Sequence, residues 1–192
     1  MNLYGASGHA KVIISILKLM GKKINTIFDD KAPFNILGIK VKQYDNKTRD
    51  NFIISVGNNK TRKEIIEKLP DLTFSNAIHP NVIIDKTASI DKGSVVMAGA
   101  IINVDTKIGK HCIINTAASI DHDCVIADYA HISPNVTLSG NVTIEEGTHI
   151  GAGAVVIQNI TIGKWCTIGA GAVIIKNVPD GATVVGNPGR IL

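Results

Sequence analysis

A histidine between two carboxylates is the clearest candidate for chemistry in this chain. Asp121, His122 and Asp123 follow one another between Ile120 and Cys124. Histidine can accept a proton near neutral pH, and a carboxylate bonded to its other ring nitrogen fixes the tautomer and raises the basicity. Either aspartate suits that role, and the sequence does not decide between them. A histidine at a turn is also often only solvated, so both interpretations stay open.

Other candidates follow at regular intervals. His131 and His149 each precede an aliphatic residue of the repeat described below, so both should point outward, where they could line a groove between neighbouring molecules. Gly140 would let the backbone approach a ligand closely. The glycine pairs 151/153 and 169/171 form a strip without side chains, suited to a narrow extended ligand or simply to turns.

Two more histidines have structural interpretations. His111 lies beside Lys110 at an expected turn, and we predict that it is solvated surface. His79 precedes Pro80 near the boundary between two differently patterned parts of the chain, and its expected role is structural.

A six-residue repeat must position these side chains. Every sixth residue from Ile84 to Ile174 is a branched aliphatic, at 16 positions out of 16. Small or modest side chains stand two residues before each of them, and turn-forming residues fill the rest. Inward positions two apart fit a strand, and hexapeptide repeats are typical of a parallel β-helix, with six residues to a side. The aliphatic series is Ile84, Ile90, Val96, Ile102, Ile108, Ile114, Ile120, Ile126, Ile132, Leu138, Ile144, Ile150, Val156, Ile162, Ile168 and Ile174.

The part of the chain before the repeat follows a different pattern, which predicts a small βαβ unit with a parallel, Rossmann-like sheet. The expected domains are therefore residues 1–76 and a β-helix over 77–192 with a C-terminal tail. The strands expected in the first domain are 3–4, 24–28, 52–56 and 72–77, and the helices are 10–20 and 61–69.

Polar residues end three of those strands. The glycine turn from Gly5 to His9 follows the first strand, Asp29 and Asp30 follow the second, and Gly57 with two asparagines follows the third. Ligands of open α/β sheets bind beyond the carboxyl ends of the strands, and backbone N–H groups at the start of a helix attract anions. The third glycine of a dinucleotide fingerprint is absent, which favours a nucleotide-linked compound over NAD. Tight-turn and solvated-turn roles remain alternatives.

The composition excludes several classes of protein. The 192 residues carry a net charge of +4, from 20 basic and 16 acidic side chains, which is too mild for a nucleic-acid-binding protein. We expect neither a signal peptide nor a membrane span, since no apolar stretch reaches about 18 residues. Cys112, Cys124 and Cys166 fall on inward positions, so we expect packing roles in a reducing cytoplasm and no metal site.

Over nearly its full length the chain resembles the bacterial sugar acyltransferases of the PglD/NeuD type. That family combines a nucleotide-sugar-binding βαβ domain with a left-handed parallel β-helix and uses acetyl-CoA without a metal. The matching segments are Tyr4 to His9, Asp29-Asp30, Val56 to Asn59, Ile78 to Pro80, Asn115-Thr116, His122 to Cys124, His131 to Ser133, Gly140-Asn141 and the Gly186-Asn187-Pro188 tail.

The resemblance implies roles for particular residues. His122 would be the general base and Asp123 the carboxylate that tunes it, although some relatives carry Glu there. His131 would contact acetyl-CoA, and the backbone N–H near Gly140 would stabilise the oxyanion. Main-chain contacts to the coenzyme are implied at Ala152 and Ala170. The positions implied to bind the nucleotide sugar are Ser7, Gly8, His9, Asp29, Asp30 and Gly57.

The sequence therefore predicts an acetyl-CoA-dependent N-acetyltransferase for a nucleotide-linked 4-amino-4,6-dideoxy sugar, expected to be UDP-linked. The resemblance also implies a homotrimer with the site between two prisms, where His122, His131 and His149 would share an outer face with a neighbouring wall. An O-acetyltransferase acting on sialic acid or a related sugar is the enzymatic alternative. A non-catalytic β-helix scaffold or binding protein is the alternative of another class.

Overall fold

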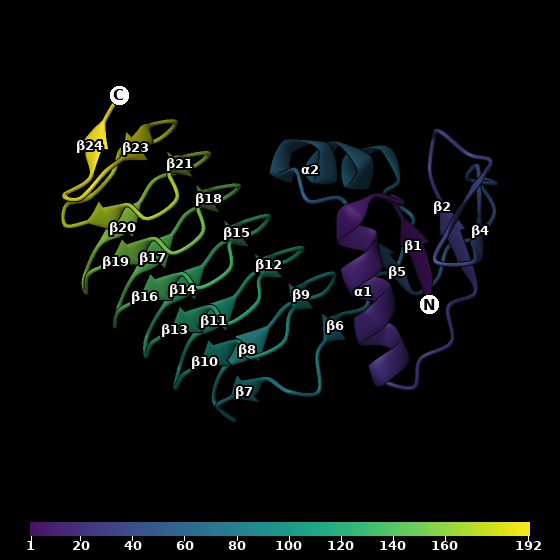
Figure 1. The fold of residues 1–192 in the computed structure, drawn as a ribbon, viewed down its shortest axis with the longest axis horizontal. Helices are drawn as coiled ribbons and strands as arrows, with labels where there is room; N and C mark the ends of the chain where they lie inside the picture. Colours follow the sequence, from purple (N-terminus) through teal and green to yellow (C-terminus); the bar gives the residue numbers. More distant parts are fainter.

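Short parallel strands build a three-sided prism from residue 77 onward in the computed structural model, which describes residues 1–192 (Figure 1). Sixteen two-residue strands, β7 to β22, each end on an aliphatic residue of the repeat. Strands pair with those one coil away, as Ile84 does with Ile102 and Ile102 with Ile120. The predicted left-handed parallel β-helix is confirmed.

The prism has one sheet on each side, of eight, six and five strands. The eight-stranded sheet contains β6 (Ala77–Ile78), β9 (Val95–Val96), β12 (Ile113–Ile114), β15 (His131–Ile132), β18 (His149–Ile150), β21 (Thr167–Ile168), β23 (Thr183–Val185) and β24 (Arg190–Ile191). The six-stranded sheet contains β7 (Ile83–Ile84), β10 (Ile101–Ile102), β13 (Ser119–Ile120), β16 (Thr137–Leu138), β19 (Val155–Val156) and β22 (Val173–Ile174). The five-stranded sheet contains β8 (Ser89–Ile90), β11 (Lys107–Ile108), β14 (Val125–Ile126), β17 (Thr143–Ile144) and β20 (Thr161–Ile162).

The aliphatic series fills the inside of the prism. Its members from Val96 to Ile174 are at most 3% exposed, while Ile84 and Ile90, in the first coil, are partly buried against them. Full burial of each such side chain contributes roughly 1.5–3 kcal/mol. Because every aliphatic packs on those one coil away, the stacked coils form one continuous core.

Polar side chains on the smaller inward positions satisfy their hydrogen bonds along the prism. Ser94, Thr106 and Thr148 each donate from the hydroxyl to a carbonyl oxygen 15 residues further on, at 2.8, 2.8 and 2.6 Å. A buried hydroxyl without a partner would be costly, so the repeat supplies an acceptor at the same offset each time. The three cysteines occupy the same inward positions, buried and unpaired, as predicted.

A mixed sheet with two helices precedes the prism. The elements are β1 (Asn2–Tyr4), α1 (Gly8–Leu19), β2 (Thr26–Phe28), β3 (Phe34–Ile36), β4 (Ile39–Lys42), β5 (Phe52–Ile54) and α2 (Asn59–Lys68), with sheet order β3-β4-β2-β1-β5. The sheet is parallel except for β3, which pairs antiparallel with β4. The three strands and two helices predicted before residue 70 are present, with shifted ends.

Two features of this part differ from the prediction. The hairpin β3–β4 was not predicted; it turns at Leu37 and Gly38, which both have positive φ, as tight hairpins require. The strand predicted over 72–77 is wrong. Phe74 forms only an isolated bridge to Phe52, and Ala77 already belongs to β6 of the prism.

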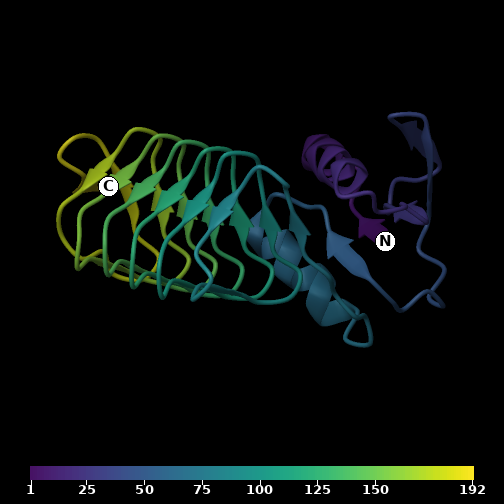
Figure 2. The same ribbon diagram turned by 90° about the horizontal axis from the view of Figure 1, so that it is seen from below.

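The two parts of the chain share a hydrophobic cluster. Ile13 and Ile14 of α1 pack in one core with Val95 and Ile113, whose side chains face outward from the eight-stranded sheet. Figures 1 and 2 show the N-terminal part at the start of the prism, with the coils advancing away from it towards the C-terminus. The division at residue 76 stays a prediction, because this shared core joins the two parts.

His111 is not solvated surface, contrary to the prediction; it is 4% exposed. Phe74 meets its ring edge-on, with centroids 4.5 Å apart, and Tyr129 stacks on it at 5.6 Å. Burial lowers the pKa of His111 to about 4. Six-residue periodicity alone did not reveal that Phe74, from the N-terminal part, would cover this corner.

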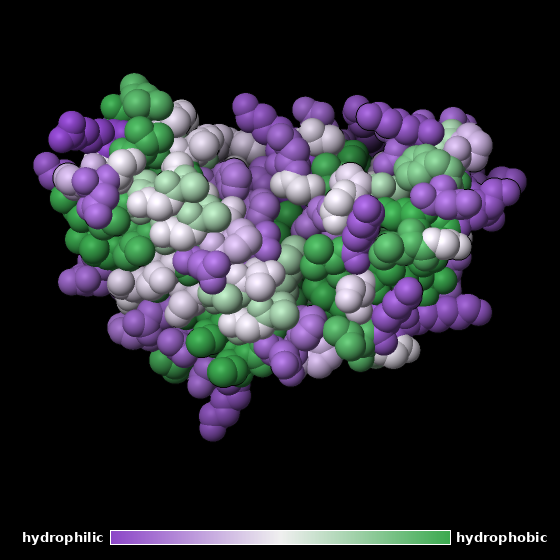
Figure 3. Space-filling model, viewed as in Figure 1, coloured by the Kyte–Doolittle hydropathy of each residue, from purple (hydrophilic) through white to green (hydrophobic).

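The surface of the molecule is mixed in hydropathy. Hydrophilic and hydrophobic residues are intermixed over the face shown in Figure 3. No helix is both long enough and apolar enough to cross a membrane.

Candidate active site

His122 lies at the corner where the six-stranded and five-stranded sheets meet, between β13 and β14. Its Nδ1 is 2.8 Å from Oδ2 of Asp123, which has a left-handed φ of 57°. Asp121 instead accepts hydrogen bonds from the His122 backbone N–H, at 2.8 Å, and from Asn103 Nδ2, at 3.1 Å. Asp123 is thus the carboxylate that contacts the ring, and Asp121 fixes the backbone beneath it.

This corner holds a basic, accessible imidazole. The hydrogen bond that His122 Nδ1 donates to Asp123, together with the charge of Asp121, raises the pKa of His122. The His122 side chain is 53% exposed, and its Nε2 forms no hydrogen bond within the chain. With Nδ1 occupied by the carboxylate, Nε2 is the atom free to accept a proton.

Gly140 lies one coil further on, directly against the His122 ring. A Cβ at Gly140 would stand 2.5 Å from Cε1 and 2.6 Å from Nε2 of His122. Only glycine leaves room for the ring in this position. The sequence predicted close approach of a ligand to Gly140, and the structure places the His122 side chain there.

The predicted nucleotide-sugar residues gather at one edge of the N-terminal sheet. Strands β2, β1 and β5 are adjacent and parallel, so the segments that follow them lie together. Asp29 uses both carboxylate oxygens locally, accepting from the N–H groups of Ala6 and Lys31 at 2.8 and 2.9 Å. Asp30 is exposed and accepts from the Tyr4 hydroxyl through one oxygen, at 2.6 Å. Asp29 therefore shapes the glycine turn, while one carboxylate oxygen of Asp30 forms no hydrogen bond within the chain.

The glycine turn leads into an open helix N-terminus. Ser7 caps α1 without a side-chain hydrogen bond, and Ser7 and Gly8 are exposed. The first turn of α1 contains no acidic residue. Its free N–H groups are therefore available to an anion.

His131 and His149 stack on the outer face of the eight-stranded sheet, with ring centroids 4.8 Å apart. His131 Nε2 lies 3.2 Å from Asn115 Nδ2, and His149 Nε2 lies 2.8 Å from Ser133 Oγ. Burial, and next the charge of His149, lower the pKa of His131 to about 3, so its ring is neutral at physiological pH.

A hollow of about 550 Å³ joins this face to the N-terminal part. Gly57 and the first residues of α2 line one side of it, and His131 and His149 line the other. His9 does not line this hollow, but it is partly buried and its charge acts on His131. Burial, followed by the charge of Arg62, lowers the pKa of His9 to about 4.

One chain does not bring all the predicted residues together. His122 is at the corner between the six-stranded and five-stranded sheets, whereas His131 and Gly57 lie along the eight-stranded sheet opposite that corner. The hydrophobic core fills the space between them. The prediction that the three histidines share one outer face is therefore wrong for a single chain. A whole side of the prism separates the corner that carries His122 from the middle of the eight-stranded sheet that carries His131 and His149.

Backbone N–H groups remain free where ligand contacts were predicted. The N–H groups of Gly140, Ala152 and Ala170 donate to no acceptor in the chain. Ala152 and Ala170 stand between glycines at the corner that follows β18 and β21. Ala152 and Ala170 are exposed, so their N–H groups suit a ligand that runs along this corner, whereas Gly140 is buried at a different corner.

Comparisons with known proteins agree with this architecture. Residues 1–69 match the PglD N-terminal domain, and residues 105–140 and 141–176 match the bacterial transferase hexapeptide family. PerB from Caulobacter crescentus, solved with CoA and GDP-perosamine, is 33% identical, with a TM-score of 0.94, and the match covers 100% of this chain and 96% of PerB. The chain belongs to the PglD-type sugar acetyltransferases of the hexapeptide transferase family.

Two further members of the family are similarly close. The acetyltransferase domain of PglB from Neisseria gonorrhoeae, solved with acetyl coenzyme A, is 36% identical with a TM-score of 0.93. WeeI from Acinetobacter baumannii is 30% identical with a TM-score of 0.91. Each match covers 100% of this acetyltransferase and 98% of the other chain.

Several residues in or beside the candidate site were not singled out from the sequence. Asn103 stands one coil before Asp121, so the period of the coils could have indicated it. Asn115 was noted only within a matching segment, and its contact with His131 reaches across to the next coil. No sequence pattern indicated a role for Arg62, because nothing in the sequence showed where helix α2 would pack on the prism.

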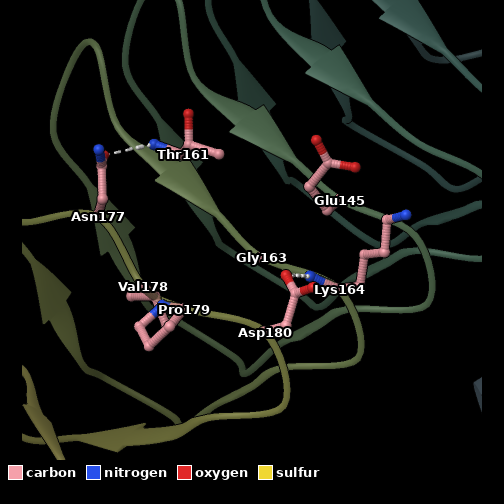
Figure 4. A pocket seen from close by; sticks show the side chains of 8 residues that line it. All are labelled: Glu145, Thr161, Gly163, Lys164, Asn177, Val178, Pro179 and Asp180. Carbon is pink, nitrogen blue, oxygen red and sulfur yellow. Dashed lines mark hydrogen bonds between the residues drawn. The ribbon is translucent and has the colours of Figure 1, made fainter.

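Another hollow, of about 590 Å³, lies on the five-stranded side of the last coils (Figure 4). Asn177 and Asp180 accept there from the backbone N–H groups of Thr161 and Lys164, both at 2.8 Å. None of the predicted site residues lines it, and its side chains serve the turns of the final coil. No group of three or more His, Cys, Asp or Glu side chains is placed to hold a metal ion.

Proposed function

We propose that this acetyltransferase transfers the acetyl group of acetyl-CoA to the amino group of a nucleotide-linked 4-amino-4,6-dideoxy sugar, with His122 as general base. The observation that carries the proposal is the accessible His122–Asp123 pair in a chain whose relative PerB was solved with CoA and GDP-perosamine. PglB, solved with acetyl coenzyme A, supports the acyl donor.

His122 would act in two steps. Its Nε2 removes a proton as the sugar nitrogen forms a bond to the thioester carbonyl carbon, and Asp123 stabilises the resulting imidazolium. When the tetrahedral intermediate collapses, the C–S bond breaks and His122 returns the proton to the leaving sulfur. The free N–H of Gly140 is available to the oxyanion formed between these steps.

The charge distribution supports an anionic acceptor on the N-terminal part. Residues 1–76 contain 13 basic and 7 acidic side chains, whereas residues 77–192 contain 7 and 9. The positive excess thus lies on the part with the open α1 N-terminus and Asp30. A nucleoside diphosphate would be attracted there through its phosphates, leaving the sugar to extend towards the prism.

A homotrimer would complete the site. His122 of one prism would face the Gly57–His131 side of its neighbour, which accounts for their separation within a single chain. Ala152 and Ala170 would hold acetyl-CoA along the corner between the two prisms. The three unpaired cysteines fit a reducing compartment, and we place the reaction in the cytoplasm.

An O-acetyltransferase acting on sialic acid needs the same base and donor, and it remains the alternative within the family. PerB, which was solved with a nucleotide-linked amino sugar, favours the N-acetyltransferase. For the nucleotide, we retain UDP as our expectation, and GDP is the alternative suggested by PerB.

The test is a panel of acceptors incubated with acetyl-CoA. The panel contains UDP- and GDP-linked 4-amino-4,6-dideoxy sugars, their 4-hydroxy counterparts and sialic acid, and mass spectrometry follows the addition of one acetyl group. We expect an amide product from an amino sugar and no reaction with its hydroxy counterpart. Acetylation of sialic acid alone would favour the alternative, and an inert panel would contradict both.

A further inference from the structure

Arg62, at the end of the first turn of α2, is a buried cation without a carboxylate partner. It is 1% exposed, and its guanidinium takes part in none of the ion pairs of the chain. Burial lowers the pKa of Arg62 to about 10, which leaves it charged at neutral pH. Burying a charge lowers the stability of the fold unless hydrogen bonds compensate it. The hydrogen-bond partners of Arg62 therefore indicate its role.

All five N–H groups of the guanidinium find acceptors, and four of these acceptors are backbone carbonyls. Nε donates to His111 O at 2.9 Å, Nη1 to Val56 O and Gly57 O at 3.1 Å each, and Nη2 to Asn59 Oδ1 at 2.9 Å and Tyr129 O at 2.7 Å. One side chain therefore joins the loop after β5, the start of α2 and two coils of the prism.

The prism acceptors form a column along one corner. His111, Tyr129 and Gly147 occupy equivalent places in successive coils where the five-stranded and eight-stranded sheets meet, and all three have positive φ. Their carbonyls accept no hydrogen bond from the backbone of the prism. Asn59 Nδ2 donates to Gly147 O at 3.0 Å, so the first turn of α2 contacts three successive coils.

The loop held by Arg62 borders the candidate active site. Gly57 lines the hollow opposite His131 and His149. The contact of Arg62 with the Gly57 carbonyl therefore sets how far this loop stands from the face that carries His131.

We propose that Arg62 is a positioning residue that fixes the Val56–Gly57 loop against the prism, so that the bound nucleotide sugar is presented to the face carrying His131. This inference rests on the proposed function. Arginine suits the task because its planar fork offers five donors in fixed directions, whereas lysine offers three on a flexible stem.

The test compares Arg62→Lys and Arg62→Gln with the control Lys63→Met. Lys63 also docks α2 on this corner, through Glu146 at 2.6 Å, but contacts neither Val56 nor Gly57. Amide hydrogen exchange over residues 55–60 should become at least about tenfold faster in both Arg62 variants and stay unchanged in the control. The KM for the nucleotide sugar should rise about tenfold or more, while the KM for acetyl-CoA stays within about twofold.

Other outcomes would overturn the inference. Unchanged exchange over residues 55–60 would show that Arg62 does not hold the loop. Faster exchange with an unchanged sugar KM would show that the held loop does not position the acceptor. Loss of folding in both variants would assign Arg62 to global stability. A wild-type protein that neither binds nor acetylates nucleotide-linked amino sugars would instead contradict the proposed function.

Discussion

At the scale of the residue, Asp123 controls the basicity of His122. Its hydrogen bond is the main cause of the raised pKa of His122, and the charge of Asp121 adds to it. A base must be neutral to accept a proton, so turnover should fall as the pH drops through this pKa, which lies above the ordinary histidine value.

Asp123→Asn should therefore change the pH profile. Without the carboxylate, the pKa of His122 falls, so the acid limb of kcat against pH should move to lower pH. The maximal rate should fall about tenfold or more, because the imidazolium is less stabilised. Asp121→Asn serves as the comparison and should move the limb less. If the acid limb of kcat against pH stayed in place in Asp123→Asn, Asp123 would not be the carboxylate that raises the pKa of His122.

Gly140→Ala tests whether the His122 ring needs this glycine. The added methyl would displace the exposed ring into solvent, so turnover should fall about tenfold or more while stability changes by less than about 1 kcal/mol. In a His122→Ala background the same substitution should have no further effect, because no ring remains to be displaced. Equal losses in both backgrounds would mean that the methyl obstructs a ligand instead.

The residue scale also shows the limits of prediction from sequence. The sequence singled out His122 and its two neighbouring aspartates because they differ from the regular repeat. Only the structure of the corner showed that Asp123, and not Asp121, contacts the ring. The burial of His111 and the contacts of Arg62 depend on where Phe74 and α2 pack. Phe74 and α2 lie outside the six-residue repeat, so the repeat could not predict either packing contact.

At the scale of the element, a two-residue strand is stable only through its stack. Ile162 is buried between coils, whereas its neighbour Thr161 faces out on the same strand, β20. Ile162→Ala should lower the free energy of unfolding by about 2–5 kcal/mol through the lost methyl groups and the cavity left behind. Urea unfolding at a fixed protein concentration measures this loss.

Thr161→Ala is the matched control and should change the free energy of unfolding by less than about 0.5 kcal/mol. Similar losses in the two variants would contradict the inward–outward alternation on which the prism rests. This alternation could be predicted because each strand repeats the same local rule. The hairpin β3–β4 is not part of any sequence repeat, so no repeated pattern was available to predict it.

At the scale of the whole molecule, the proposed mechanism needs a site shared between subunits. His122 and His131 lie on opposite sides of one prism, so neither can serve the other within a chain. The prism of one chain followed from its repeat, but the repeat does not show which sides of two prisms meet. Substitutions made identically in every subunit cannot test this sharing, because they remove the same group from every site.

Mixed oligomers test the shared site most directly. His122→Ala should lower kcat about 10²–10⁴-fold if His122 is the general base. His131→Ala, which alters the opposite side of the prism, should also lose most of its activity. When the two variants are co-expressed and co-purified, about one quarter of the sites should combine two intact halves, and this fraction of wild-type turnover should return. Mixed oligomers no more active than the separate variants would contradict a site built from two subunits.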